Sequence, residues 1–408
     1  MITLDEYIKE NLKKCIRENT NDSGTLLGVP YPYIVPSTEH FDELYYWDTY
    51  FANIGLLKCG MHKLAKDNVD NMLYLVDKYG FMPNGNRTYY LIHSQPPLLS
   101  EMVRDIYNHF CDDVWLRGAY GALVKEYSFW MEKRSFDIGL NYYDSDVPLG
   151  REKDFAAGFV KRIGFKPRIG DYDLARHALA TSESGWDMNP RCKFDLYNNA
   201  TADLNSLLYG FERNMAYFAK KLKKYTDEIT WKSRSKERLE NMNSYMLNDE
   251  NIFLDYNYVT GKKSDVFSVA SYFAMFTKAA NEKQAKTLVD NLPKLEEKYG
   301  ISTCEKRNTN IDYQWDYPNG WACLQYIMIR GLENYGYHDD AVRISKKYVE
   351  LVEKVFAETQ NLWEKYNVVE GNINVSHEYK MPTMLGWSAG VYIFAKDFLK
   401  CTASKSIV

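Results

Sequence analysis

The stretch Gln314-Trp315-Asp316-Tyr317-Pro318-Asn319-Gly320-Trp321 is the least ordinary part of this chain. Two indoles flank a carboxylate and a Pro-Asn-Gly turn, and an apolar run with helical spacing, 322–332, follows directly. Such a grouping is typical of sugar-binding proteins, because an indole packs on the C–H face of a sugar while a neighbouring carboxylate and amide bind its hydroxyls. A loop that carries two tryptophans for structural reasons alone would look the same. The stretch by itself therefore leaves both interpretations open.

Helical spacing extends over most of the chain and predicts an all-α protein. In 62–79, for example, Val69, Met72 and Val76 recur at helical intervals, and Gly80 follows at the position where helices commonly end. About twelve long helices joined by turns suggest a closed ring of six helical hairpins, an (α/α)6 barrel. The expected helices are 3–18, 41–58, 62–79, 98–110, 114–133, 172–180, 202–224, 229–247, 265–279, 282–298, 321–335, 339–358 and 386–399.

No low-complexity linker divides the chain, so we expect one domain over 1–408. Within it, we expect 1–39 to form an N-terminal helix followed by an irregular segment that leads into the barrel. The Gly- and Pro-punctuated stretch 136–170 reads as a long loop that could serve as a lid. Strand signals are confined to 89–92 and 367–375.

Composition is ordinary for a globular protein, with 45% hydrophobic and 26% charged residues. The net charge of −4 gives no reason to expect a nucleic acid or an anionic membrane as partner. The aromatic content is unusual, because 34 Tyr, 19 Phe and 9 Trp make up 15% of the chain. This surplus fits a helical core, a carbohydrate cleft, or both.

The cysteines favour a cytoplasmic protein with reduced thiols, because seven is an odd number and no C-x-x-C pair occurs. The first residues show neither the basic nor the apolar region of a signal peptide, and no run of about 18 apolar residues predicts a membrane span. The seven histidines have no metal-ligand spacing, and phosphate-loop, dinucleotide and nucleophile-elbow motifs are missing from the sequence. We therefore expect no metal or cofactor and a chemistry based on carboxylates.

Three carboxylates are candidates for that chemistry. Asp187 follows Trp186 in a turn, and a carboxyl held against an indole is partly desolvated, which raises its pKa and suits a proton donor. A helix N-cap is the structural alternative for Asp187. Glu364 also follows an indole, and it could instead be a surface residue paired with Lys365. The third candidate is Glu378. Glycoside hydrolysis requires two carboxylates on opposite sides of the scissile bond.

Several segments resemble the trehalases, family 37 of the glycoside hydrolases. The stretch 314–322 resembles their second signature, and 41–51 resembles the first. Residues 83–97 resemble another distinctive segment, and Glu183-Ser184-Gly185-Trp186-Asp187 resembles the segment with the general acid. The matches occur in the family's order and span 41 to about 390. The Asn189-Pro190-Arg191 tail also resembles the related family 63 α-glycosidases.

The resemblance implies an (α/α)6 barrel that cleaves with inversion of configuration. It implies Asp187 as general acid and Glu364 as the general base that activates water, with carboxyl groups roughly 6.5–9.5 Å apart. Trp315 is the expected platform for a sugar, and Arg168 resembles a family arginine. The remaining side chains that match sugar-contact positions are Phe41, Tyr45, Trp47, Asp48, Asn84, Gln95 and Glu378.

Some positions depart from the family pattern. His40 and His93 stand where trehalases usually carry arginine, and Gly170 replaces a glutamate that binds sugar. Histidine cannot reproduce the fixed fork of donors that arginine offers to adjacent hydroxyls. The catalytic pair is thus retained while the pocket for the leaving group is altered, which fits a changed substrate or a trehalase with remodelled subsites.

Three functions remain open at this point. The first is an inverting α-glycosidase that splits α,α-trehalose into two glucose molecules. The second is a relative that applies the same chemistry to another small α-glucoside or α-mannoside. The third is a non-catalytic sugar-binding barrel, and the joint presence of Asp187 and Glu364 argues against it.

Overall fold

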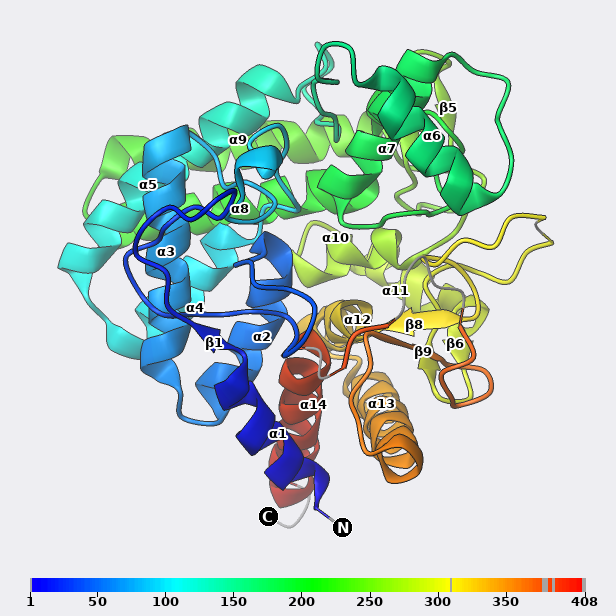
Figure 1. The fold of residues 1–408 in the computed structure, drawn as a ribbon. Helices are drawn as coiled ribbons and strands as arrows, with labels where there is room; N and C mark the ends of the chain where they lie inside the picture. The colour runs from blue at the N-terminus through cyan, green and yellow to red at the C-terminus, as the bar shows by residue number, and fades with distance from the viewer. Residues whose placement is uncertain (1, 309, 376–380, 384–385, 406–408) are drawn as a thin grey trace.

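The computed structural model describes residues 2–308, 310–375, 381–383 and 386–405, and it shows a ring of helices (Figure 1). Each inner helix packs against the next, and the last packs against the first. The predicted all-α class and the (α/α)6 barrel are therefore confirmed. In ring order the inner helices are α2 (Tyr46–Lys58), α4 (Leu99–Phe110), α8 (Ala202–Lys221), α10 (Phe273–Phe276), α12 (Ala322–Asn334) and α14 (Gly386–Lys405).

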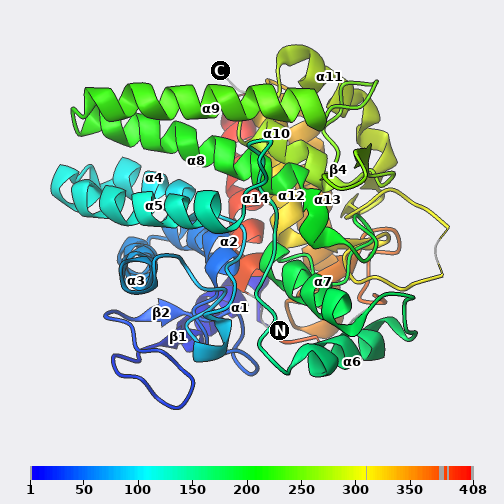
Figure 2. The same ribbon diagram turned by 90° about the horizontal axis from the view of Figure 1, so that it is seen from above.

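The outer helices pack outside this ring (Figure 2). Helix α3 (His62–Tyr79) covers α2 and α4, α5 (Asp113–Lys133) covers α4 and α8, and α9 (Tyr225–Tyr245) lies along α8. Helix α13 (His338–Thr359) covers α12 and α14. The periphery also holds α11 (Glu282–Asn291) and α1 (Leu4–Lys14).

The ring closes between α2 and α14, where two glycines meet. A Cβ added to Gly390 would lie 2.1 Å from the Phe51 carbonyl oxygen, and one added to Gly55 would lie 2.5 Å from the Gly390 Cα. Any larger residue at either position would force the two backbones apart. These glycines therefore allow the first and last inner helices to approach closely enough to complete the barrel.

Most predicted helices occur close to their expected limits. Helix α3 spans the predicted residues, and Gly80 ends it with a φ of 85°, in the left-handed region that glycine tolerates. There are two exceptions. In 265–279 only a four-residue helix, α10, and the 3-10 turn Val269–Tyr272 form, and the helix predicted over 282–298 ends at Asn291. Backbone hydrogen bonds to neighbouring loops take the place of helical ones, as between the Val269 N–H and the Thr303 carbonyl.

The stretch 136–170 is not a continuous loop, which corrects that expectation. It contains α6 (Glu152–Ile163), which packs along α7 (Asp171–Ser184). The apolar side chains of α6 are few, with Ala156 and Phe159 buried, so the helical pattern is weak in the sequence.

The strands are two or three residues long and pair segments of the loops with one another. Antiparallel pairs form between β1 (Ile16–Arg17) and β2 (Tyr33–Ile34), and between β6 (Glu296–Glu297) and β7 (Gly300–Ile301). A three-stranded sheet holds β3 (Asn199–Ala200), β4 (Tyr256–Asn257) and β5 (Lys262–Lys263) in that order. The predicted strand at 89–92 is wrong, because a 3-10 turn, Thr88–Tyr90, occupies it. Two further 3-10 turns are Leu196–Asn198 and Leu292–Lys294.

The pairing of β8 (Asn319–Trp321) with β9 (Lys365–Asn367) shapes the site. It is antiparallel and sets Trp321 opposite Lys365. The tryptophan-rich stretch is thereby placed beside Glu364, although more than 40 residues separate them in the sequence. No helix among the described residues is long and apolar enough to cross a membrane.

Candidate active site

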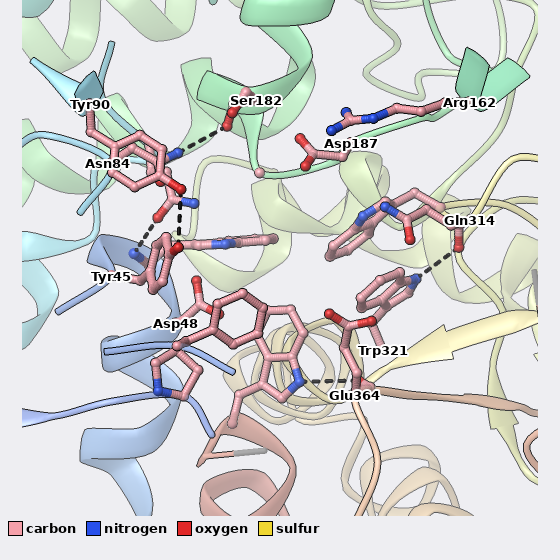
Figure 3. A pocket seen from close by; sticks show the side chains of 17 residues that line it. Tyr45, Asp48, Asn84, Tyr90, Arg162, Ser182, Asp187, Gln314, Trp321 and Glu364 are labelled. Atoms are coloured by element: carbon pink, nitrogen blue, oxygen red, sulfur yellow. Dashed lines mark hydrogen bonds between the residues drawn. The ribbon is translucent and has the colours of Figure 1, made fainter. Parts of the chain in front are cut away.

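A cavity of about 230 Å³ opens at the end of the barrel where the inner helices begin (Figure 3). Asp48 lies in the first turn of α2, Trp321 directly precedes α12, and Trp387 is the second residue of α14. The cavity brings together most of the predicted site. The predicted residues that line it are Phe41, Tyr45, Trp47, Asp48, Asn84, Gln95, Asp187, Trp315 and Glu364.

Asp187 owes its position to the end of α7. Gly185 ends that helix with a φ of 69°, and a Cβ added there would lie 2.6 Å from Cε2 of Trp47. Position 185 therefore needs glycine for two reasons, the left-handed backbone of the turn and the close approach to the Trp47 ring. Trp186 is fully buried, so the next residue, Asp187, is directed into the cavity.

Buried hydrogen bonds fix the loop that follows Asp187. The Asn189 amide donates to the Trp186 carbonyl at 2.6 Å. Arg191 forms ion pairs with Asp203 at 2.6 Å and with Asp255 at 2.7 Å, and its guanidinium lies over the Trp186 ring. All three charged groups are buried, so this network holds Trp186 and the neighbouring Asp187 in one arrangement.

Glu364 is held by its neighbours on β8 and β9. Lys365 is fully buried, and its Nζ donates to Glu364 Oε2 at 2.8 Å and to the Gln314 side-chain oxygen at 3.3 Å. The same ammonium lies 4.6 Å from the centre of the Trp321 ring. The structural alternative for Glu364, a surface ion pair, is wrong, because both partners are buried.

Asp187 and Glu364 face each other across the cavity (Figure 3). Asp187 approaches from the α7 side, and Glu364 approaches from the opposite wall, near β8 and α14. This arrangement can protonate an oxygen from one side and activate water on the other, as inverting hydrolysis of a glycoside requires.

Asp48 is the third carboxyl of the cavity. Burial, together with the charges of Glu364 and Asp187, raises its pKa to about 7. Below pH 7 the carboxyl is therefore largely neutral and can donate a hydrogen bond as well as accept one.

Polar groups on α2 and on the 83–97 segment line the wall opposite Arg162 and Gln314. Gln95 accepts a hydrogen bond from the Trp47 N–H at 3.1 Å, and the Asn84 amide donates to the Ser182 carbonyl at 3.4 Å. The hydroxyls of Tyr45 and Tyr90 lie 3.0 Å apart. These groups can bind the hydroxyls of a small sugar.

Four tryptophans line the cavity, Trp47, Trp315, Trp321 and Trp387, and Trp186 packs behind them against Trp315. Trp315 stacks on Trp321 with ring centroids 3.7 Å apart, and it also lies against Trp186 and Trp47. Only 2% of its surface is exposed. Trp315 nevertheless lines the cavity, so its role as a platform for a sugar stays a prediction.

Three predicted residues do not line the cavity. His40 is exposed beside Glu39. His93 is buried behind Tyr90, where its Nδ1 contacts the Ser94 carbonyl and burial lowers its pKa. Arg168 is exposed in the turn that precedes α7. The prediction for Glu378 lies outside the described residues.

Sequence reasoning missed several lining residues. Tyr90 lies in the 83–97 segment, Ser182 directly precedes the segment 183–187, and Trp387 lies near the start of α14. Arg162 carries no sequence signal, because it looks like an ordinary basic residue at the end of a helix. Among the described residues, no group of three or more His, Cys, Asp or Glu side chains could hold a metal ion.

Comparisons with known proteins agree on one family. The family model described as Trehalase matches residues 2–150 and 165–400. The chain is 30% identical to a probable trehalase of Eremothecium gossypii over 96% of its length, and it covers 60% of that protein. It is 32% identical to the periplasmic trehalase of Pseudomonas aeruginosa over 90% of its length and covers 71% of that relative.

Solved structures show the same fold. The neutral trehalase of Saccharomyces cerevisiae superposes with a TM-score of 0.79 and 29% identity, covering 92% of this chain and 75% of that one. A GH63 mannosylglycerate hydrolase from Thermus thermophilus matches with a TM-score of 0.66, and the match covers 96% of this chain and 99% of that one. At 15% identity, this second likeness concerns the fold alone.

Proposed function

Because this chain belongs to the trehalase family, we propose that it hydrolyses α,α-trehalose to two glucose molecules with inversion of configuration. The observation that carries the proposal is the placement of Asp187 and Glu364 on opposite walls of one cavity lined by polar groups and indoles. A non-catalytic sugar-binding barrel would have no need of two opposed carboxyls.

In the proposed reaction Asp187 donates a proton to the glycosidic oxygen. Glu364 accepts a proton from a water molecule, whose oxygen attacks the anomeric carbon from the opposite face. The bond to the leaving glucose breaks as the new C–O bond forms. Lys365 and Gln314 act as positioning residues, because the Lys365 ammonium bonds to both the Glu364 carboxylate and the Gln314 amide oxygen.

Glucose release from purified protein tests the substrate, with trehalose, kojibiose, nigerose and mannosylglycerate compared. We expect turnover of trehalose. If another disaccharide is hydrolysed and trehalose is not, the assignment is overturned. NMR of the first product should show β-glucose from the attacked ring, and an α product would contradict inversion.

Substitution of the two carboxyls tests their roles. Asp187→Asn and Glu364→Gln should each lower kcat by about 10²- to 10⁴-fold, the range of general acid and base catalysis. Asp249→Asn, an exposed residue on a distant loop, serves as control and should leave the rate unchanged. A rate near wild type for Asp187→Asn would show that the acid is another group.

A second candidate is the same chemistry on another small α-glucoside. It is favoured by one observation, that His40, His93 and Arg168 do not line the cavity. The side of the pocket that holds the leaving group therefore differs from the predicted pattern, and the disaccharide panel distinguishes the two candidates.

We further propose that the protein acts in the cytoplasm. All seven cysteines are free, which suits a reducing compartment, whereas the Pseudomonas relative is named as periplasmic. Fractionation of the native cells is the test, and recovery of the activity outside the cytoplasm would contradict the proposal.

A further inference from the structure

Arg162 is a guanidinium in the cavity that comes from a segment unlike the rest of the chain. The family model matches residues up to 150 and again from 165. Helix α6 lies entirely between these limits, and Arg162 is in its last turn. The chain therefore brings to its cavity an arginine that the family pattern does not account for.

The packing of α6 fixes it relative to the acid. Ala156 and Phe159 of α6 are buried in one cluster with Leu174, Met188 and Tyr313. Leu174 belongs to α7, and Met188 directly follows Asp187. Helix α6 is thus attached to the same loop that holds Asp187, and Arg162 lines the cavity beside it.

The view into the cavity shows on which side Arg162 acts (Figure 3). Its guanidinium points toward Asp187, whereas Asp48 and Glu364 lie across the cavity. In inverting hydrolysis the base and its water lie on the side of the attacked ring, and the acid lies at the oxygen that departs with the leaving ring. Arg162 is therefore on the leaving-group side, and its solvent exposure agrees with a position near the rim.

We propose that Arg162 is a specificity-determining residue that binds the hydroxyls of the leaving glucose. The inference rests on the proposed function. A guanidinium presents a rigid fork of donors to adjacent hydroxyls, and Arg162 offers it at the cavity wall, where His40, His93 and Arg168 do not reach. Helix α6 would then determine which second sugar this chain accepts.

Two substrates separate this role from others. Trehalose has a sugar as its leaving group, whereas α-glucosyl fluoride has only fluoride. Arg162→Gln should lower kcat/KM for trehalose by roughly 10- to 100-fold, as expected for a lost charged hydrogen bond, mainly through KM. It should leave kcat/KM for the fluoride near wild type. Arg162→Lys keeps the positive charge but not the fork of donors, so its kcat/KM for trehalose should lie between those of wild type and Arg162→Gln.

Arg168→Gln is the matched control. It removes a nearby arginine whose side chain is exposed and does not line the cavity. Equal trehalose kinetics for Arg162→Gln, Arg168→Gln and wild type would overturn the inference, as would an equal loss on both substrates. A shifted pH profile of kcat/KM with unchanged KM would also overturn it, because Arg162 would then act through Asp187.

Failure of the proposed function gives a different result, namely that the wild type hydrolyses neither substrate. Calorimetric titration of glucose into wild type and Arg162→Gln tests the contact without turnover. Weaker glucose binding in the variant supports the inference, and equal binding contradicts it.

A second polar cavity, of about 350 Å³, lies at the opposite end of the barrel. It is lined by residues along α4 and α12 and by the end of α10, including Asn108, Arg330 and Lys278. The catalytic cavity is instead lined by residues at the starts of α2, α12 and α14. Four basic side chains line it, Arg104, Arg213, Lys278 and Arg330, against two acids, Glu101 and Asp105.

The charges of this cavity are incompletely matched. Asn214 bridges Arg104 and Glu101, with bonds of 2.7 Å to each. Among the described residues, Arg213 and Arg330 lie within ion-pair distance of no carboxylate. Burial raises the pKa of Asp105 to about 7 and that of Glu101 above its usual range, so the acids neutralise the four cations only in part.

We infer that this cavity binds a phosphate group, as inorganic phosphate or as part of a phosphorylated sugar. Arginine forks match the oxygens of a phosphate, and the hydroxyls of Tyr50 and Tyr326 at the cavity wall could accompany the hydroxyls of a sugar. This inference is independent of the catalytic function.

Calorimetry with inorganic phosphate and with glucose 6-phosphate, at constant ionic strength, tests the site. Binding of either that weakens at least 10-fold in Arg330→Gln and Arg213→Gln supports it, and the tighter ligand identifies the source. Arg117→Gln removes an exposed arginine of α5 and controls for net charge. No heat with either ligand at tens of millimolar, or equal binding in all variants, would overturn the inference.

Discussion

At the scale of single residues, the geometry of the proposed catalytic pair depends on groups that take no part in the proposed chemistry. Gly185 permits the turn after α7, Trp186 is buried beneath it, and Asp187 is directed into the cavity as a result. On the other wall, Lys365 holds the carboxylate of Glu364. The two carboxyls proposed to react are placed by their immediate neighbours in the sequence, which is why short motifs can predict them.

Gly185→Ala should strongly reduce activity. Alanine at this position has to adopt a φ of 69° and would approach Cε2 of Trp47 to 2.6 Å, so the turn that carries Asp187 must shift. A misplacement of about 1 Å costs roughly 100-fold in rate, and we expect at least that loss in kcat.

Gly80→Ala is the control for this change. Gly80 also ends a helix, with a φ of 85°, but a Cβ there meets nothing within 4 Å. Only the backbone strain of about 1–2 kcal/mol applies, so Gly80→Ala should lower the unfolding temperature without affecting kcat. Equal activity of the two variants would show that the contact with Trp47 is unimportant.

At the scale of elements, the barrel is closed by the contact of α2 with α14. These helices are the first and last of the inner ring, and they touch through backbone at Gly55 and Gly390. Helix α2 also carries Trp47 and Asp48 into the cavity. A disturbance at this contact is therefore transmitted to the site by a rigid element.

Gly390→Ala should destabilise the protein by about 1–3 kcal/mol or more, the usual cost of an overpacked contact. The added methyl group would lie 2.1 Å from the Phe51 carbonyl oxygen, which is part of the α2 backbone. Chemical denaturation measures the change in free energy of unfolding.

Gly118→Ala on α5 is the matched helical control. A Cβ at Gly118 meets nothing within 4 Å, and alanine is the better helix former, so stability should rise by roughly 0.5–1 kcal/mol. If Gly390→Ala behaved like Gly118→Ala, the two backbones would be less closely packed than the structure indicates.

At the scale of the whole molecule, several buried acids make stability depend on pH. Burial raises the pKa of Glu126 to about 8 and those of Asp48 and Asp105 to about 7. The folded state then holds these protons more tightly than the unfolded state does. Their contribution is fully present below about pH 4, and it is lost as the pH rises through 7 to 8.

We expect the free energy of unfolding to fall as the pH rises from 5 to 9, and Glu126→Gln to reduce that slope. Glutamine can still accept the hydrogen bond from Tyr46 but does not ionise, so it removes a contribution of up to roughly 5 kcal/mol. Urea denaturation at several pH values measures the slope. Glu132→Gln, on the exposed face of α5, should leave it unchanged, and identical slopes in all three proteins would refute the assignment.

The closed ring also bears on domain organisation. Because the barrel is complete only when α14 reaches α2, we retain the proposal that 1–408 is one domain. Limited proteolysis should yield no stable fragment that lacks either helix.

The sequence by itself determined most of the helices and the barrel class, and it predicted the catalytic pair that we propose. Helices follow from a local spacing of apolar residues and their capping signals, and Asp187 and Glu364 follow from motifs of a few residues. The tertiary structure alone decided which other side chains reach the cavity: Arg162 and not Arg168, Tyr90 and not His93, with Trp315 enclosed by other indoles. The reason is physical, because a side chain's surroundings depend on how distant segments pack, as β8 against β9 and α6 against α7, and no local pattern contains that information.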